Sequence, residues 1–302
     1  MTINPRLASL TVAACLALAA PAALATKAKP PRIDLSSPQG ALVASRKIQC
    51  SLEDGKPVTY YWHGDMYSRV EGERDRLLFK VQGMNTRRCV TVTDPVKGTG
   101  YKLVSREILL YLDPKSGEVA RKWANPWTGE EVEVLHVAND PVNSTSWAVG
   151  RDGKPLSWTG STEGNRWWQT LTIPLFYTNP LAGDYQKYVG GFYHATEMFN
   201  FMGDLDDLLD ASKPSADTRV GWVRVSSWLP WMQMSGRPGE VYFHTAGVKL
   251  ASWDSLPEVM KKEIAANYPA YREPPPGDDA RPNETSWTYF KKMVKPQGGA
   301  SH

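Results

Sequence analysis

The side chains best suited to proton transfer lie in two segments, and the first of these contains His136. Successive side chains of a strand point to opposite faces, so alternation along residues 131–138 places His136 on the apolar face with Val132 and Val134. The polar run Asn139-Asp140-Pro141-Val142-Asn143 follows directly. An imidazole beside a carboxylate can act as a general base. His136 and Asp140 are therefore candidate catalytic residues, and Asn139 and Asn143 candidate ligand-binding residues. The alternative is a hydrogen-bonded core histidine followed by turn residues.

The second segment, residues 188–202, places Glu197 among aromatic side chains. In an extended conformation, one face carries Tyr193, Glu197, Phe199 and Phe201, and the other carries Phe192, His194, Thr196 and Met198. A glutamate on an aromatic face is either a desolvated acid or base, or the buried partner of an arginine. Arginines in strand-like runs that could pair with it are Arg88, Arg106 and Arg224. We predict Glu197 as a catalytic residue and, as ligand-binding residues, Tyr193, His194, Arg88 and Arg106.

The densest aromatic run, residues 222–234, supplies a candidate binding wall. It contains Trp228 and Trp231, followed by two methionines. Tryptophan beside adaptable methionine suits an apolar or aromatic ligand, although the same composition suits a plain core. Trp228 and Trp231 are therefore included as candidate ligand-binding residues.

Recognisable cofactor and metal motifs are missing from the sequence. The four internal histidines, His63, His136, His194 and His244, show none of the spacings typical of zinc sites. No phosphate loop, dinucleotide fingerprint or Gly-x-Ser-x-Gly elbow occurs either. The prediction is a site with neither a metal nor a cofactor.

The segments that must position these residues are predicted to be strands separated by tight turns. Nine of the twelve tryptophans lie between Trp123 and Trp231, in segments that alternate with a period of two. Alternation of Ile48, Cys50 and Leu52 predicts a strand there as well. We predict an all-β, mostly antiparallel fold, either a lipocalin-like β-barrel or two packed curved sheets, whose interior holds one small ligand.

One amphipathic helix interrupts this pattern near the C-terminus. Ser255 and Glu258 have the spacing of a capping box, and the apolar residues that follow recur at helical spacing up to Pro269. The predicted organisation is a signal peptide over 1–25, an N-terminal extension over 26–45, a sheet domain over 46–254, a helix over 255–268, and a Pro-rich tail over 269–302 that packs on the domain.

The N-terminus predicts export. Arg6 precedes an apolar run, and Ala23-Leu24-Ala25 matches the small-x-small pattern of a signal-peptidase site. The protein is thus expected in the periplasm or secreted, with lipid anchoring at Cys15 as the less favoured alternative. Removal of the signal leaves Cys50 and Cys89, either bridged or present as two small buried side chains.

Charge and hydropathy argue against a nucleic-acid partner and against an integral membrane span. A formal net charge of +3 over 302 residues does not favour a nucleic-acid partner. After the N-terminal run, no stretch is long and apolar enough to predict an integral membrane span.

Four motifs together resemble the bacterial DUF1838 proteins. They are Trp123-Ala124-Asn125-Pro126-Trp127-Thr128-Gly129-Glu130, Asn139-Asp140-Pro141-Val142-Asn143, Trp228-Leu229-Pro230-Trp231-Met232 and Pro282-Asn283-Glu284-Thr285-Ser286-Trp287. The resemblance extends from about residue 31 to residue 292. It implies a mostly bacterial, often exported family of undefined function, with a periplasmic setting and no agreed catalytic residues.

The leading functional hypothesis is an exported protein that takes a small apolar or aromatic molecule into a Trp- and Tyr-lined cavity. It would transform that molecule by cofactor-independent acid–base chemistry of the lyase, hydratase or isomerase type. The first alternative is a non-catalytic carrier with the same pocket. The second is a cell-envelope structural or interaction protein, which would show an exposed aromatic patch instead of a cavity.

Overall fold

The computed structural model describes Met1, residues 30–178 and residues 191–294, and the folded unit begins at Pro31. The predicted signal peptide after Met1, with Cys15, lies outside the described residues, as does the end of the tail. Within the described residues, no helix has the length and apolar character needed to cross a membrane.

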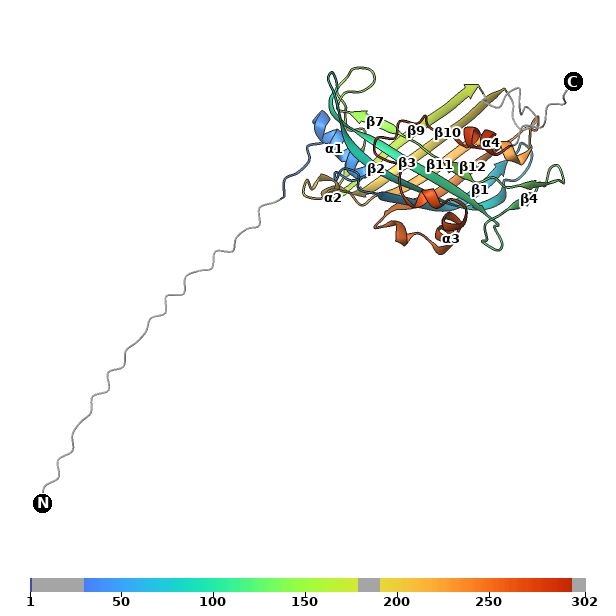
Figure 1. The fold of residues 1–302 in the computed structure, drawn as a ribbon, viewed down its shortest axis with the longest axis horizontal. Coiled ribbons are helices and arrows are strands. Elements are labelled where there is room, and N and C mark those ends of the chain that lie inside the picture. Colours follow the sequence, from blue (N-terminus) through green and yellow to red (C-terminus); the bar gives the residue numbers. More distant parts are fainter. Residues whose placement is uncertain (2–29, 179–190, 295–302) are drawn as a thin grey trace. The chain divides into compact units, whose positions relative to one another are not determined.

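A single ten-stranded antiparallel sheet dominates the folded unit (Figure 1). Its order is β6-β3-β2-β1-β12-β11-β10-β9-β8, with β7 also paired to β3. The strands are β1 (Val58–Arg69), β2 (Arg76–Asp94), β3 (Gly98–Leu112), β6 (Val137–Asn139), β7 (Ser144–Trp147), β8 (Ser161–Glu163), β9 (Arg166–Thr178), β10 (Phe192–Asp204), β11 (Arg219–Ser227) and β12 (Glu240–Leu250). A separate hairpin consists of β4 (Lys122–Ala124) and β5 (Glu131–Glu133).

The mostly antiparallel β fold is confirmed, but the sheet does not close into a barrel. Among the described residues, β6 at one edge and β8 at the other have no pairing with each other. β8 pairs only with Arg166, Trp167 and Trp168 of β9, so most of that strand has no outer partner there. Pro174 in the unpaired stretch has no N–H to offer a further strand, as is usual at sheet edges. The sheet therefore curls without completing a ring.

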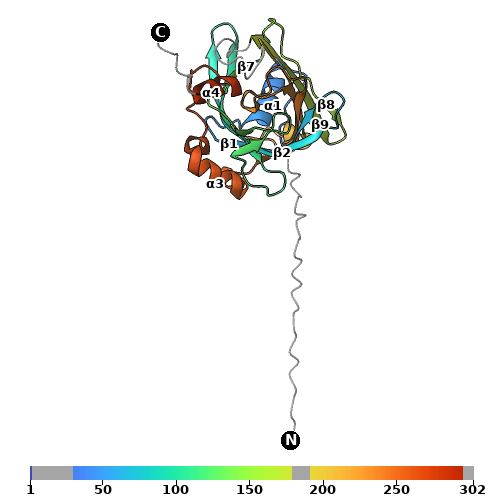
Figure 2. The same cartoon turned by 90° about the vertical axis from the view of Figure 1, so that its right-hand side faces the viewer.

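The curled sheet has two faces, which are covered by different elements. On the outer face, Ile108, Leu110 and their neighbours pack against helix α3 (Glu258–Asn267) through Met260 and Ile264. In Figure 2 the strands curve around α1, whereas α3 lies outside them. The predicted C-terminal helix is confirmed, although it begins after Pro257 and makes no side-chain cap with Ser255. A short 3₁₀ turn, η2 (Trp253–Ser255), precedes it.

The predicted strand around Ile48, Cys50 and Leu52 is wrong, because residues 38–49 form helix α1 (Pro38–Gln49). Ser37 accepts a hydrogen bond from the Gly40 N–H, and Pro38 occupies the first turn, where its missing N–H is tolerated. Ala44 and Ile48 then pack inside the curled sheet against Tyr60 and Trp167 of β1 and β9. A short alternation of apolar residues fits both a strand and the end of a helix. Here the Ser37 cap and Pro38 in the first turn favour the helix.

A disulfide joins the end of α1 to β2, so of the two alternatives for the cysteines the structure shows the bridge. Cys50 and Cys89 are both fully buried and are 39 residues apart in the sequence. Near them lies α2 (Leu205–Leu209), whose last carbonyls accept hydrogen bonds from the buried Lys47 Nζ.

The C-terminal tail contains a second helix that the sequence did not predict. After η3 (Pro269–Arg272), the chain crosses the outer face of β3, where Arg106 donates to the carbonyls of Ala270 and Glu273. It then forms α4 (Ser286–Met293), which begins with a capping box between Thr285 and Thr288. Trp287 and Phe290 of α4 join the core of the inner face, so the tail passes from the outside of the sheet to its interior.

An inner cavity with two carboxyl groups

The inner face of the sheet encloses a cavity of about 150 Å³. Strands β1, β2, β3, β10, β11 and β12 all contribute side chains to it, as does the first residue of α4. Most of the wall is aromatic or aliphatic. The polar side chains that line it are Asn85, Arg87, Glu107, Glu197, Arg224 and Ser286.

Glu107 interrupts the apolar strand β3 and points inward. It lies directly opposite Asn85 of β2 and Asn139 of β6. The Asn139 Nδ2 donates a hydrogen bond of 2.7 Å to Glu107 Oε1. Burial raises the pKa of Glu107 above its ordinary value, and the negative charge of Glu197 acts in the same direction, while the Asn139 hydrogen bond opposes them. The carboxyl of Glu107 therefore holds a proton more readily than a glutamate in water.

Glu197 has a different partner, since the register of β10 and β11 places it opposite Arg224. Arg224 Nη1 lies 2.9 Å from Glu197 Oε1, and both side chains are largely buried. The second guanidinium nitrogen, Nη2, donates to the hydroxyl oxygen of Tyr193, whose ring packs edge-on against Trp287 of α4. The neighbouring Tyr193 and Glu197 raise the pKa of Arg224, although burial alone would lower it.

Arg87 is the fourth ionisable group of the cavity described here, after Glu107, Glu197 and Arg224, and its hydrogen-bond partners are neutral. Its Nε donates to Asn85 Oδ1 at 2.7 Å and its Nη1 to Gln49 Oε1 at 2.6 Å. The guanidinium lies 4.8 Å from the ring centroid of Tyr60. Burial lowers the pKa of Arg87.

The cavity thus combines two carboxyl groups in different electrostatic environments. Glu107 is desolvated and bound by a neutral amide, whereas Glu197 forms an ion pair. Two titratable groups whose environments differ in this way can act as acid and base in a single reaction. Proton transfer to and from a bound molecule is therefore within the chemical capacity of this site.

His136 lies behind the cavity wall and is not among the residues that line it. Its ring stacks on Tyr111, and its Nδ1 accepts a hydrogen bond of 3.1 Å from the Tyr111 N–H. The neutral ring then carries its proton on Nε2, for which the described residues offer no acceptor. Burial lowers the pKa of His136 to about 4. Its catalytic role stays a prediction, and it takes no part in the mechanism proposed below.

Most of the other predicted polar residues attach the C-terminal tail to the sheet. Asp140 lies 2.9 Å from Arg106 Nε and 2.7 Å from Arg281 Nη2. Asn143 donates its amide to the Asp279 carbonyl, and Arg88 donates to the Pro274 carbonyl. These contacts lie where residues 270–281 cross the outer face of the sheet. None of these residues therefore lines the cavity.

The aromatic candidates are divided between the inner and outer faces. Tyr193 is buried inside, as alternation along β10 predicts, and His194 is exposed on the opposite face beside Phe176. Trp231 packs against Tyr111 of the cavity wall, and Trp228 packs at a tilted angle against Trp127 in the same core cluster. Of the predicted residues, only Glu197 lines the cavity directly. His136, Tyr193, Asn139 and Trp231 contact groups that do.

Sequence reasoning missed Glu107 and Arg87 as site residues. Glu107 is an acidic residue within the long apolar run of residues 101–112, and such a residue must either face a polar partner or have its pKa shifted. Arg87 and Arg88 are adjacent, so one of them necessarily faces inward. Parity could have distinguished them only once the register of β2 was known.

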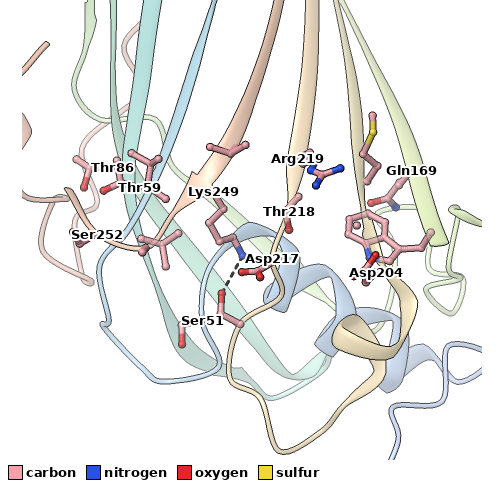
Figure 3. Close-up of a pocket in the computed structure, with 18 of the residues that line it drawn as sticks. Ser51, Thr59, Thr86, Gln169, Asp204, Asp217, Thr218, Arg219, Lys249 and Ser252 are labelled. Atoms are coloured by element: carbon pink, nitrogen blue, oxygen red, sulfur yellow. Dashed lines mark hydrogen bonds between the residues drawn. The ribbon is translucent and has the colours of Figure 1, made fainter. Parts of the chain in front are cut away.

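A second, wider depression of about 1360 Å³ lies where the strands end near α1 and α2 (Figure 3). Lys249 extends from the end of β12 into this region, and burial lowers its pKa to about 7. Its Nζ lies within hydrogen-bond distance of the Lys47 carbonyl at 2.6 Å, the Ser215 hydroxyl at 3.1 Å and the Cys50 carbonyl at 3.3 Å. These three acceptors surround the amine, so Lys249 attaches the end of α1 to the sheet.

A grouping of three or more potential metal ligands does not occur among the His, Cys, Asp and Glu side chains of the described residues.

Comparison with known families confirms the resemblance drawn from the motifs. A family model described as a protein of unknown function, DUF1838, matches residues 55–294. The matched region runs from just before β1 to the end of α4 and includes every residue that lines the inner cavity. No curated protein matches the chain.

Proposed function

We propose that this chain, which belongs to the DUF1838 family, is an exported protein that binds a small molecule in the inner cavity and moves a proton on it without a cofactor. Glu107 acts as the acid and Glu197 as the base. The observation that carries this proposal is the presence of two carboxyl groups in one aromatic-walled cavity, one held by an amide and the other by a guanidinium.

The dimensions of the cavity support a ligand of about one ring. An engineered cavity of roughly 150 Å³ in another protein is large enough for benzene, and the inner cavity has a similar volume of about 150 Å³. Trp62, Trp222 and Phe243 contribute flat apolar surfaces to its wall, which suits an aromatic or compact aliphatic body.

The chemistry follows from the two carboxyl groups. The Glu197 carboxylate takes a proton from a carbon or oxygen atom of the ligand, and the protonated Glu107 delivers one to a second atom of the same molecule. The sum of these two transfers is an isomerisation, or an elimination when the protonated atom departs as a leaving group. Arg224 stays beside Glu197 and stabilises the negative charge that develops on the ligand as Glu197 removes its proton.

A non-catalytic carrier would use the same cavity and would need neither transfer. Both functions are tested by incubating the purified protein with a small-molecule extract of the native host and following all compounds by mass spectrometry. The proposal expects one compound to be depleted and another to appear. Glu107→Gln and Glu197→Gln should each slow this conversion at least ~100-fold, because general acid–base groups contribute about that much.

The matched control is Glu133→Gln, since Glu133 is exposed on the β5 hairpin and lies away from the cavity. It should convert the compound at the wild-type rate. Binding of a compound without any conversion would identify the protein as a carrier. Undiminished conversion by both cavity variants would refute the assigned acid and base.

A further inference from the structure

Arg87 differs from the other largely buried arginines of the chain in the charge of its partners. Arg46 pairs with Asp54, Arg106 with Asp140 and Arg224 with Glu197, in each case within 3 Å. Arg87 instead contacts the neutral side chains of Asn85 and Gln49, and no carboxylate of the described residues lies within ion-pair distance of it. It also faces the cavity.

The surroundings of Arg87 include a second basic side chain, Lys249, and among the described residues no ion-pair partner. Lys249 Nζ lies 5.7 Å from the ring centroid of Tyr60, and the Arg87 guanidinium lies 4.8 Å from the same ring. The acid of the cavity whose charge acts on Arg87 is Glu107, which forms no ion pair with it and whose pKa burial raises. This end of the cavity therefore contains a partly desolvated guanidinium that, among the described residues, has no carboxylate in direct contact. Such an arrangement is costly unless an anion binds there.

One nitrogen of Arg87 remains available to that anion. Its Nε and Nη1 are engaged by Asn85 and Gln49, which also fix the plane of the guanidinium, and no described residue accepts a hydrogen bond from Nη2. Across the strand pair, Glu107 has one oxygen bound to Asn139 and a second oxygen without a partner among the described residues. A protonated Glu107 would donate from that second oxygen.

We infer that the molecule bound in the inner cavity carries a single carboxylate, which Arg87 holds through Nη2 while its apolar body packs against the aromatic wall. This inference deepens the proposed function, because it names the class of ligand for the same cavity. One carboxylate oxygen accepts from Arg87, which leaves the protonated Glu107 free to deliver its proton to another atom of the molecule. A phosphate dianion fits less well, because it would require more donors than this end of the cavity supplies.

Matched acid and alcohol probes test this inference. Isothermal titration calorimetry should compare benzoate with benzyl alcohol, and cyclohexanecarboxylate with cyclohexylmethanol, so that each pair shares its body and differs in charge. At least one acid should bind about tenfold or more tightly than its alcohol. Arg87→Met should abolish that preference. Arg76→Met should retain it, because Arg76 belongs to the same strand but pairs with Glu73 at the surface.

Each alternative outcome is decisive. Equal binding of acid and alcohol would overturn the carboxylate class and leave a binding cavity intact. A preference that persists in Arg87→Met would overturn the role of Arg87. If no probe binds, the inference is wrong, while the conversion experiment with host extract decides the proposed function separately. If the Arg87 variant does not fold, the wild-type comparison of acids with alcohols still decides the ligand class.

Discussion

Glu107 and Glu197 line one cavity but have partners of different charge. Asn139 offers Glu107 a neutral N–H, which offsets little of the free energy needed to bury a carboxylate. Arg224 offers Glu197 an opposite charge as well as a hydrogen bond. Glu107 should therefore reduce the stability of the folded protein when it ionises, and this can be measured without knowledge of the ligand.

We expect Glu107→Gln to be more stable than the wild type at pH 7.5. The pKa of Glu107 is raised above 4.5 in the folded state, so this group contributes stability that is lost as pH rises through the folded pKa. Glutamine keeps the acceptor for Asn139 and does not titrate. Urea unfolding should show the advantage at pH 7.5 and its loss below pH 4.5. A variant less stable than the wild type at both pH values would contradict this.

Protonation of His136 should lower the stability of the folded protein as the pH falls, whereas ionisation of Glu107 lowers it as the pH rises. Its pKa falls from 6.5 in the unfolded chain to about 4 when folded, so the unfolded state binds more protons between these values. The stability contributed by the neutral ring is lost as pH falls from 6.5 to 4, by up to about 3 kcal/mol. His136→Gln should flatten this part of the pH profile. Loss of turnover at unchanged stability would instead restore His136 as a catalytic residue.

Elements from both ends of the chain complete the cavity formed by the sheet. Helix α1 packs into one end of the curled sheet through Ile48, and it also positions Gln49 against Arg87. Helix α4 packs at the other end through Trp287 and contributes Ser286 to the cavity wall. The disulfide Cys50–Cys89 fixes the end of α1 to the sheet, so its removal should loosen the Arg87 side of the cavity.

The double variant Cys50→Ala with Cys89→Ala should unfold at lower denaturant concentration. A bridge across 39 residues stabilises by about 4 kcal/mol in the chain-entropy estimate. Wild-type protein treated with a reductant should reach the same midpoint as the variant, which controls for the substitutions themselves. Identical midpoints for oxidised and reduced wild type would show that the bridge contributes no stability.

Alternation along the chain predicted which residues of β10 share a face, because successive side chains of a strand point to opposite faces. Tyr193 and Phe201 are buried on one face and His194 is exposed on the other, although both Tyr193 and His194 were predicted as ligand-binding residues. The same rule failed over residues 47–52, where a short run matches a strand and a helix end equally well. The partner of Glu107 could not be predicted, since it depends on a strand register between segments more than thirty residues apart.

At the scale of the whole molecule, a curled sheet with a bridged N-terminal helix is consistent with an exported protein. Disulfides persist in oxidising compartments, which is where the predicted signal peptide would deliver the chain. We expect the protein isolated from its native host to begin at Thr26. Intact-mass measurement checks this, and a mass that retains residues 1–25, or that carries lipid on Cys15, would disprove cleavage at this site.

The pairing of β1 with β12 has a consequence for how the chain reaches its fold. Thr59 lies opposite Leu250, so two strands about 190 residues apart in sequence meet at the middle of the sheet. Chain entropy must be lost before such a distant pair gains any contact energy, which makes folding slow. The central ladder cannot form until residues near 250 have been synthesised. A nascent chain of this topology therefore completes its sheet only late in synthesis, so under the proposed export it would reach a translocation channel before its central ladder can form.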